Sequence, residues 1–163
     1  MPIKLLPLLL LLVVPGLQAE QCQTNSEGLC NIFIEDSLPS GKRFKLEVAE
    51  APLKVESRVD QRRTGYWGAN GGYPDSYIEK ISLVVEQSKL SIPSKVFTDL
   101  GNLTFVEIKE NEHAIAIIVK GGEASAAYYA TFLFVDEKII KRTVRSVENP
   151  DQLWERTAFY EPD

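Results

Sequence analysis

The chain has 163 residues and a formal net charge of −5, with 44% hydrophobic and 25% charged residues. This composition is typical of a folded globular protein and unlike that of a disordered or fibrous one. The acidic balance argues against a general nucleic-acid-binding protein, because such a protein needs a basic surface to neutralise phosphates. The length is that of a single domain of ordinary size.

Residues 1–19 have the features of a secretory signal peptide. Lys4 gives a short positive region, residues 5–14 are almost wholly apolar, and Ala19 is a small residue suited to cleavage. The apolar run is too short to span a membrane, which takes about 20 residues. We therefore expect cleavage after Ala19 and an exported protein, periplasmic or secreted, with no stable membrane insertion. Residues 20–163 are expected to form one β-rich domain.

The two cysteines support the expectation of export. Cys22 and Cys30 are the only cysteines, and an even number in an exported chain predicts a disulfide. Their spacing is not the Cys-x-x-Cys of a redox centre, which favours a structural role. A bridge over so short a loop would fasten the N-terminus with a stabilisation at or below about 2–4 kcal/mol.

Short runs of Val, Ile, Phe, Tyr and Thr, separated by Gly, Pro, Asn and Asp, predict β-strands along the whole chain. The expected strands are residues 44–48, 53–59, 77–86, 103–108, 114–119, 126–135 and 139–147. The last three follow one another through turns at Gly121-Gly122 and Asp136-Glu137-Lys138, which predicts an antiparallel three-strand meander.

Two short helical turns interrupt this pattern. Residues 93–100 begin with Pro93 and are followed by Gly101, and residues 149–152 have an N-cap-like Asn-Pro start. A last strand is expected at residues 157–160. The sequence thus predicts a mostly β fold: an antiparallel β sandwich or barrel with a C-terminal three-strand meander and one or two short helices.

The sequence holds few of the residue patterns that carry catalysis or bind metals. His113 is its only histidine, so neither a zinc site nor a Ser–His–acid triad has its usual residues. No P-loop, nucleophile elbow or calcium loop is present. We expect no cofactor and no metal, and we favour a binding function over an enzymatic one. A carboxylate-dependent hydrolase remains the enzymatic alternative, since a pair of acids that meet only in three dimensions leaves no sequence pattern.

One loop stands out, because residues 58–77 combine arginines, tyrosines and a tryptophan with four glycines. Glycine and proline exclude a regular element there, and Trp, Tyr and Arg are the residue types enriched at binding hot spots. The predicted binding residues are Arg62, Arg63, Tyr66, Trp67, Tyr73 and Tyr77. The alternative is that Trp67 fills one end of the β fold while the arginines are solvated.

Two further segments are weaker candidates for a partner surface. Residues 121–129 place two tyrosines after a run of small residues, and we expect close packing there more than partner binding. A basic stripe follows, with Lys138, Lys141, Arg142 and Arg145 on one strand. We expect a solvated strand face, with an acidic partner as the alternative.

Several segments are similar to parts of small exported bacterial inhibitors of lysozyme. They are Leu38-Pro39-Ser40-Gly41-Lys42, the apolar strand at residues 114–119, and Gly121-Gly122 followed by Tyr129-Ala130. The resemblance extends to size and export, but not to the arginine and tryptophan loop or the C-terminal residues 149–160. It therefore transfers no functional residue.

The favoured function is an exported, non-enzymatic binding protein of the bacterial envelope or exterior, with a protein or glycan partner and no nucleic acid. An inhibitor or immunity protein against an envelope hydrolase such as lysozyme is the alternative.

Overall fold

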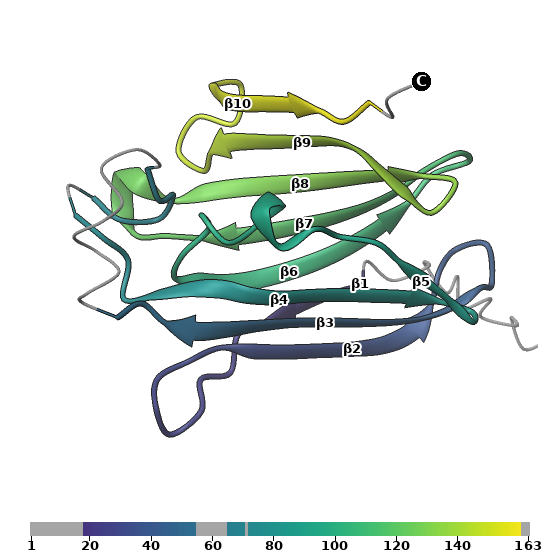
Figure 1. Cartoon of the computed structure of the whole chain (residues 1–163), viewed down its shortest axis with the longest axis horizontal. Helices are drawn as coiled ribbons and strands as arrows, with labels where there is room; N and C mark the ends of the chain where they lie inside the picture. Colours follow the sequence, from purple (N-terminus) through teal and green to yellow (C-terminus); the bar gives the residue numbers. More distant parts are fainter. Residues whose placement is uncertain (1–17, 55–64, 71, 161–163) are drawn as a thin grey trace, which may run out of the picture.

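The computed structural model describes residues 18–54, 65–70 and 72–160, which form two antiparallel β-sheets (Figure 1). One sheet has six strands in the order β1-β6-β7-β8-β9-β10, and the other has four in the order β2-β3-β4-β5. The six-stranded sheet consists of β1 (Gln18–Gln21), β6 (Leu103–Glu110), β7 (Ile115–Gly121), β8 (Tyr128–Val135), β9 (Lys138–Ser146) and β10 (Leu153–Ala158). The four-stranded sheet consists of β2 (Asn31–Ser37), β3 (Arg43–Pro52), β4 (Ser76–Val85) and β5 (Ser88–Leu90). The predicted mostly β fold is confirmed, as a sandwich and not as a closed barrel.

The predicted meander is confirmed and is longer than the sequence indicates. Strands β7, β8 and β9 pair antiparallel in chain order, and β6 and β10 extend the series on either side. Tight turns suffice to connect neighbouring antiparallel strands, so most of these residues pair with the next segment of the chain.

The core lies between the sheets and follows from the alternation of apolar residues. On β3, Phe44, Leu46 and Val48 are buried, and the residues between them face outward. On β8, Tyr128, Ala130, Phe132 and Phe134 alternate in the same way. A strand presents every second side chain to one face, so this pattern gives each strand one buried side. Full burial of one such large side chain contributes about 1.5–3 kcal/mol.

The Cys22–Cys30 disulfide is confirmed, and Glu50 connects the residues around it to both sheets. The Glu50 carboxylate accepts hydrogen bonds from the Cys30 amide at 3.0 Å, the Ser76 hydroxyl at 2.7 Å and the Leu103 amide at 2.6 Å. Ser76 begins β4 and Leu103 begins β6. This acid therefore has a structural role that its position in the sequence does not reveal.

Of three local predictions, one is wrong, one has shifted bounds and one is contradicted at its start. Residues 149–152 form a turn, closed by a hydrogen bond from the Gln152 amide to the Asn149 carbonyl at 2.9 Å, and not a helix. The last strand is β10, Leu153–Ala158, because pairing with the edge of β9 prevails over the local helix signal. Strand β3 continues to Pro52, so Leu53 begins no new strand, and residues 55–59 lie outside the described residues.

The predicted turn near Pro93 is confirmed in a shorter form, as the 3₁₀ turn η1 (Ser94–Val96). Val96, Phe97 and Leu100 are buried, as one apolar face requires. A second 3₁₀ turn, η2 (Ala124–Ala126), precedes β8. Among the described residues, no helix is long and apolar enough to cross a membrane.

Candidate functional site

The described part of the aromatic segment lies at one end of the sandwich, which we call the loop end (Figure 1). There the Trp67 amide donates to the Asp99 carbonyl at 2.8 Å, and the Gly101 amide donates to the Trp67 carbonyl at 3.0 Å. These bonds form a short parallel bridge between Trp67 and Leu100. The backbone of this segment is thus fixed to the connection that leads into β6.

Glycines allow three segments to approach closely at the loop end, and we call Gly68, Gly101, Gly121 and Gly122 the glycine junction. A Cβ atom on Gly68 would lie 2.6 Å from the Gly101 carbonyl oxygen, and one on Gly122 would lie 2.7 Å from the Gly68 Cα. Both glycines also have positive φ angles, +105° and +81°, which side chains rarely tolerate. Any other residue at these two positions would force the segments apart.

Tyr128 is the buried side chain around which the junction closes. Its hydroxyl donates to the Gly101 carbonyl at 3.0 Å. Burial raises the pKa of Tyr128 well above its usual value of 10.0, the negative charges of Glu50 and Asp99 raise it further, and Arg142 opposes them. The neighbouring Tyr129 lies on the other face of the sheet, with the Lys120 ammonium 5.7 Å from its ring centre. In segment 121–129, Gly121 and Gly122 therefore take part in packing, whereas Ala124 and Ser125 are exposed.

Trp67 stacks on Trp154 of β10, with ring centroids 5.4 Å apart and an interplanar angle of 11°. Both rings are half-buried and pack against the core. This arrangement matches the alternative in which Trp67 fills one end of the fold. It also anchors Tyr66, its neighbour in the chain.

Three of the predicted binding residues, Tyr66, Tyr73 and Tyr77, gather at the surface beside this stack, and we call them the tyrosine cluster. Tyr66 and Tyr73 make an edge-to-face contact with ring centroids 6.2 Å apart, and Tyr73 is 40% exposed. Partial burial, the charge of Glu79 and the nearby Tyr66 together raise the pKa of Tyr77 above 10.0. The Tyr77 hydroxyl is therefore a neutral donor at physiological pH. Arg62 and Arg63 lie outside the described residues.

The predicted basic stripe is divided between two faces of the sheet. Arg142, expected to be solvated, is instead buried: its guanidinium contacts both Asp99 oxygens at 2.8 and 2.6 Å, and Glu155 at 3.2 Å. Lys141 and Arg145 have the opposite alternation and face outward. Arg142 differs because η1 lies over it, and the Val96 carbonyl of η1 accepts a further hydrogen bond at 2.6 Å.

Asp99 and Glu155 are two acids that meet only in three dimensions, in a shallow hollow of about 450 Å³ lined also by Lys95 and Phe159. Both carboxylates bind the same guanidinium. This arrangement is that of a structural ion-pair network, which cross-links η1, β9 and β10. It gives the enzymatic alternative no specific support.

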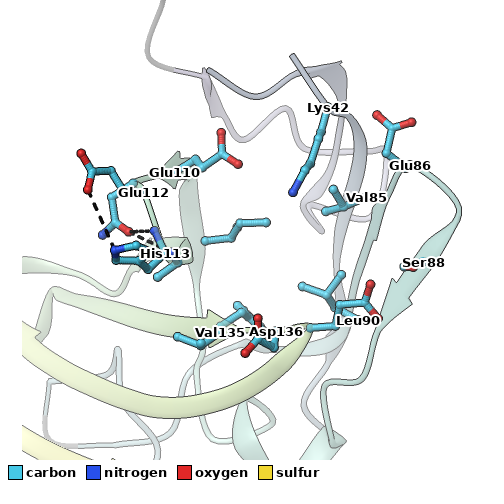
Figure 2. A pocket seen from close by; sticks show the side chains of 15 residues that line it. Lys42, Val85, Glu86, Ser88, Leu90, Glu110, Glu112, His113, Val135 and Asp136 are labelled. Atoms are coloured by element: carbon cyan, nitrogen blue, oxygen red, sulfur yellow. Dashed lines mark hydrogen bonds and ion pairs between the residues drawn. The ribbon is translucent and has the colours of Figure 1, made fainter. Parts of the chain in front are cut away.

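A second hollow lies at the opposite end of the sandwich, where the short hairpin turns lie, and we call it the turn-end pocket (Figure 2). Its volume is about 770 Å³. Apolar side chains from both sheets line it, namely Val85, Leu90, Ile115 and Phe134. Five acids surround them, namely Glu86, Glu110, Glu112, Asp136 and Glu137, together with Lys42 and His113.

The sequence does not reveal this pocket, although the turn at Asp136-Glu137-Lys138 is predicted. The acidic residues of the pocket's turns are far apart along the chain, and only the strand order brings them to one end. His113 lies in the β6–β7 turn with an exposed side chain, 3.9 Å from the Glu112 carboxylate. No group of three or more metal-ligating side chains converges within the described ranges.

Comparisons with protein-family models, curated proteins and solved structures give no match for this chain.

Proposed function

We propose that the chain is an exported, non-enzymatic binding protein that engages a protein or glycan partner through the tyrosine cluster. The observation that carries the proposal is the edge-to-face contact of Tyr66 and Tyr73, 6.2 Å apart, with Tyr73 exposed and Tyr77 nearby. Tyrosine side chains offer a large, rigid contact area with a hydroxyl that donates or accepts hydrogen bonds. They also lose little conformational entropy on binding, because they have only two rotatable side-chain bonds.

The loop end supports the proposal because it holds the cluster on a rigid base. Backbone hydrogen bonds on both sides of Trp67, its stack on Trp154 and the glycine junction all restrict the segment that carries Tyr66. A surface that is already ordered loses less freedom on association. In this arrangement Trp67 positions the cluster, while Tyr66, Tyr73 and Tyr77 make the contact. Arg62 and Arg63 precede it in the chain and are proposed as flanking contacts.

Export is proposed on the signal-peptide pattern of residues 1–19 together with the Cys22–Cys30 disulfide, since disulfides persist in oxidising compartments. An inhibitor or immunity protein against an envelope hydrolase such as lysozyme is the more specific form of this proposal. It is tested by measuring lysozyme activity with and without the purified protein.

The proposal is tested by affinity capture with the immobilised protein and its Tyr66→Ser/Tyr73→Ser variant. Envelope and culture-fluid extracts are passed over both, and any retained protein or glycan is then tested in purified form. The matched control is Phe33→Ser, which removes a 56% exposed aromatic ring from β2, where Phe33 pairs with Glu47 while Tyr77 pairs with Ala51. We expect a partner that binds the parent and the control but not the double variant. Equal binding to all three would place the interface elsewhere.

A further inference from the structure

The turn-end pocket combines an apolar floor with a negatively charged rim. The floor is formed by Val85 and Leu90 from the four-stranded sheet and by Ile115 and Phe134 from the six-stranded sheet. At about 770 Å³ the pocket is within the range of small-ligand sites, which are mostly apolar with a few polar groups that set orientation. The floor would contact the apolar part of a ligand, and the rim selects its charge.

Five carboxylates and one ammonium, that of Lys42, line the rim, so the balance of charge there is negative. Glu110 accepts hydrogen bonds from the Ser40 amide at 2.8 Å and the Ser40 hydroxyl at 2.9 Å, and Glu86 accepts one from the Arg43 amide at 2.5 Å. These donors are neutral, so they orient the carboxylates without neutralising them. The cations of Arg43, Lys45, Lys80, Lys109 and Arg142 form ion pairs with acids outside the rim.

The acids are distributed around the opening and do not converge on one point. They come from the β4–β5, β6–β7 and β8–β9 turns and from the end of β6. Since no group of three ligating side chains converges among the described residues, the rim is unsuited to a single metal ion. A diffuse negative potential beside an apolar surface suits an organic cation, which has a charged head and an apolar body.

We propose that the turn-end pocket binds a primary alkylammonium group, with the alkyl chain on the apolar floor and the ammonium at the acidic rim. Two sources share this chemistry: a free alkylamine, and the lysine side chain of a peptide. The site is separate from the tyrosine cluster, so the proposal does not depend on the proposed function.

Substitution of Lys42 offers a way to test whether the pocket binds a cation. Figure 2 shows its side chain extending into the opening, with the ammonium between the Glu110 side and the Glu86 side. It repels a second cation and also occupies part of the opening. Replacing Lys42 by Met removes the charge while keeping a similar length, and should therefore strengthen binding.

The proposal is tested by titrating hexylammonium chloride into ¹⁵N-labelled protein and following the backbone amide signals. We expect shifts confined to residues 85–90, 110–115 and 134–138, and weaker binding of hexanol and hexanoate. The Asp136→Asn/Glu137→Gln variant should bind hexylammonium about 3- to 10-fold more weakly, as expected for two exposed charges. Lys42→Met should bind it several-fold more tightly.

Glu148→Gln is the control, because it removes an exposed acid near the opposite end of β9 and should leave hexylammonium affinity unchanged. A capped Leu-Lys-Leu peptide distinguishes the two sources. Binding at least as tight as that of hexylammonium indicates a peptide lysine, and binding of hexylammonium alone indicates a free amine. The proposal is overturned if hexanol binds as tightly as hexylammonium, if the shifts lie outside the pocket, or if Glu148→Gln weakens binding as much as the rim variant.

Discussion

The two ends of the sandwich differ because their connections differ in length. At the turn end, short turns join the strands, at residues 38–42, 86–87, 111–114 and 136–137. At the loop end, the connections are longer, and residues 53–75, 91–102, 122–127 and 147–152 begin or finish there. Turns of two to five residues only reverse the chain, whereas the longer connections have enough residues to cover the gap between the two sheets.

The consequence is visible in the side chains at each end. The loop end is filled by Trp67, Trp154, Tyr128 and the glycine junction, and the tyrosine cluster lies at its surface. The turn end stays open, with the apolar residues of the core at the floor of a pocket and acids around it. One end therefore presents a rigid aromatic surface, and the other presents a charged hollow.

The largest expected effect is a loss of stability when a methyl group is added at the loop end. Gly68→Ala places a Cβ 2.6 Å from the Gly101 carbonyl oxygen at a φ of +105°. The left-handed conformation costs about 1–2 kcal/mol and the clash about 1–3 kcal/mol, so we expect a decrease of about 2–5 kcal/mol in the free energy of unfolding. Urea denaturation measures it.

Gly41→Ala is the matched control at the turn end. Gly41 has a similar φ of +86°, but nothing lies within 4 Å of its added Cβ. Only the conformational cost of about 1–2 kcal/mol should apply. Equal losses in the two variants would show that the loop end is not closely packed, and the contrast between the ends would disappear.

Tyr128→Phe should lower the free energy of unfolding by about 1–3 kcal/mol at neutral pH, because the Gly101 carbonyl loses its buried donor. The parent should also lose stability in alkali. The pKa of Tyr128 is raised in the folded protein, so the native state holds this proton when the unfolded chain has released it. The stabilisation is complete below pH 10 and falls as the pH rises above it. Thermal unfolding from pH 8 to 11 measures this slope, which should be shallower in Tyr128→Phe than in Tyr129→Phe.

At the turn end, a substitution should increase stability. Asp136 and Glu137 form a two-residue turn between β8 and β9, with φ angles of +48° and +67°. Two positive angles define a type I′ turn, which prefers Asn-Gly. Asp136→Asn/Glu137→Gly should therefore raise the free energy of unfolding by about 1–2 kcal/mol. The control Asp136→Ser/Glu137→Gln removes the same charges without favouring the turn, and an equal gain there would assign the effect to charge repulsion.

The sequence predicts the parts of this molecule that depend on neighbouring residues. The apolar runs and turns of the meander predict β7, β8 and β9, and Cys22 with Cys30 predicts the disulfide. Strand β2 was missed, because only Ile32, Phe33 and Ile34 are apolar and its pairing with β3 completes it. The helical turn expected at residues 149–152 is wrong for the same reason, since pairing with β9 decides the local structure.

The candidate sites depend on contacts between distant residues and could be predicted only in part. The composition of residues 58–77 draws attention to the tyrosines, but the stack of Trp67 on Trp154 joins residues far apart in the chain. The burial of Arg142 depends on η1, which precedes it by more than one strand. The turn-end pocket depends on the strand order, which brings the turns that carry its acids to one end of the sandwich.

The smallest expected effect is on the stability of the Tyr66→Ser/Tyr73→Ser variant. Tyr73 is 40% exposed, and the contact between the two rings lies outside the core. Surface substitutions of this kind change the free energy of unfolding by less than about 1 kcal/mol. The same urea denaturation that measures Gly68→Ala should therefore find this variant close to the parent. A loss as large as that of Gly68→Ala would mean that the tyrosines belong to the packing of the loop end, whereas near-parental stability means that any lost binding is a property of the surface itself.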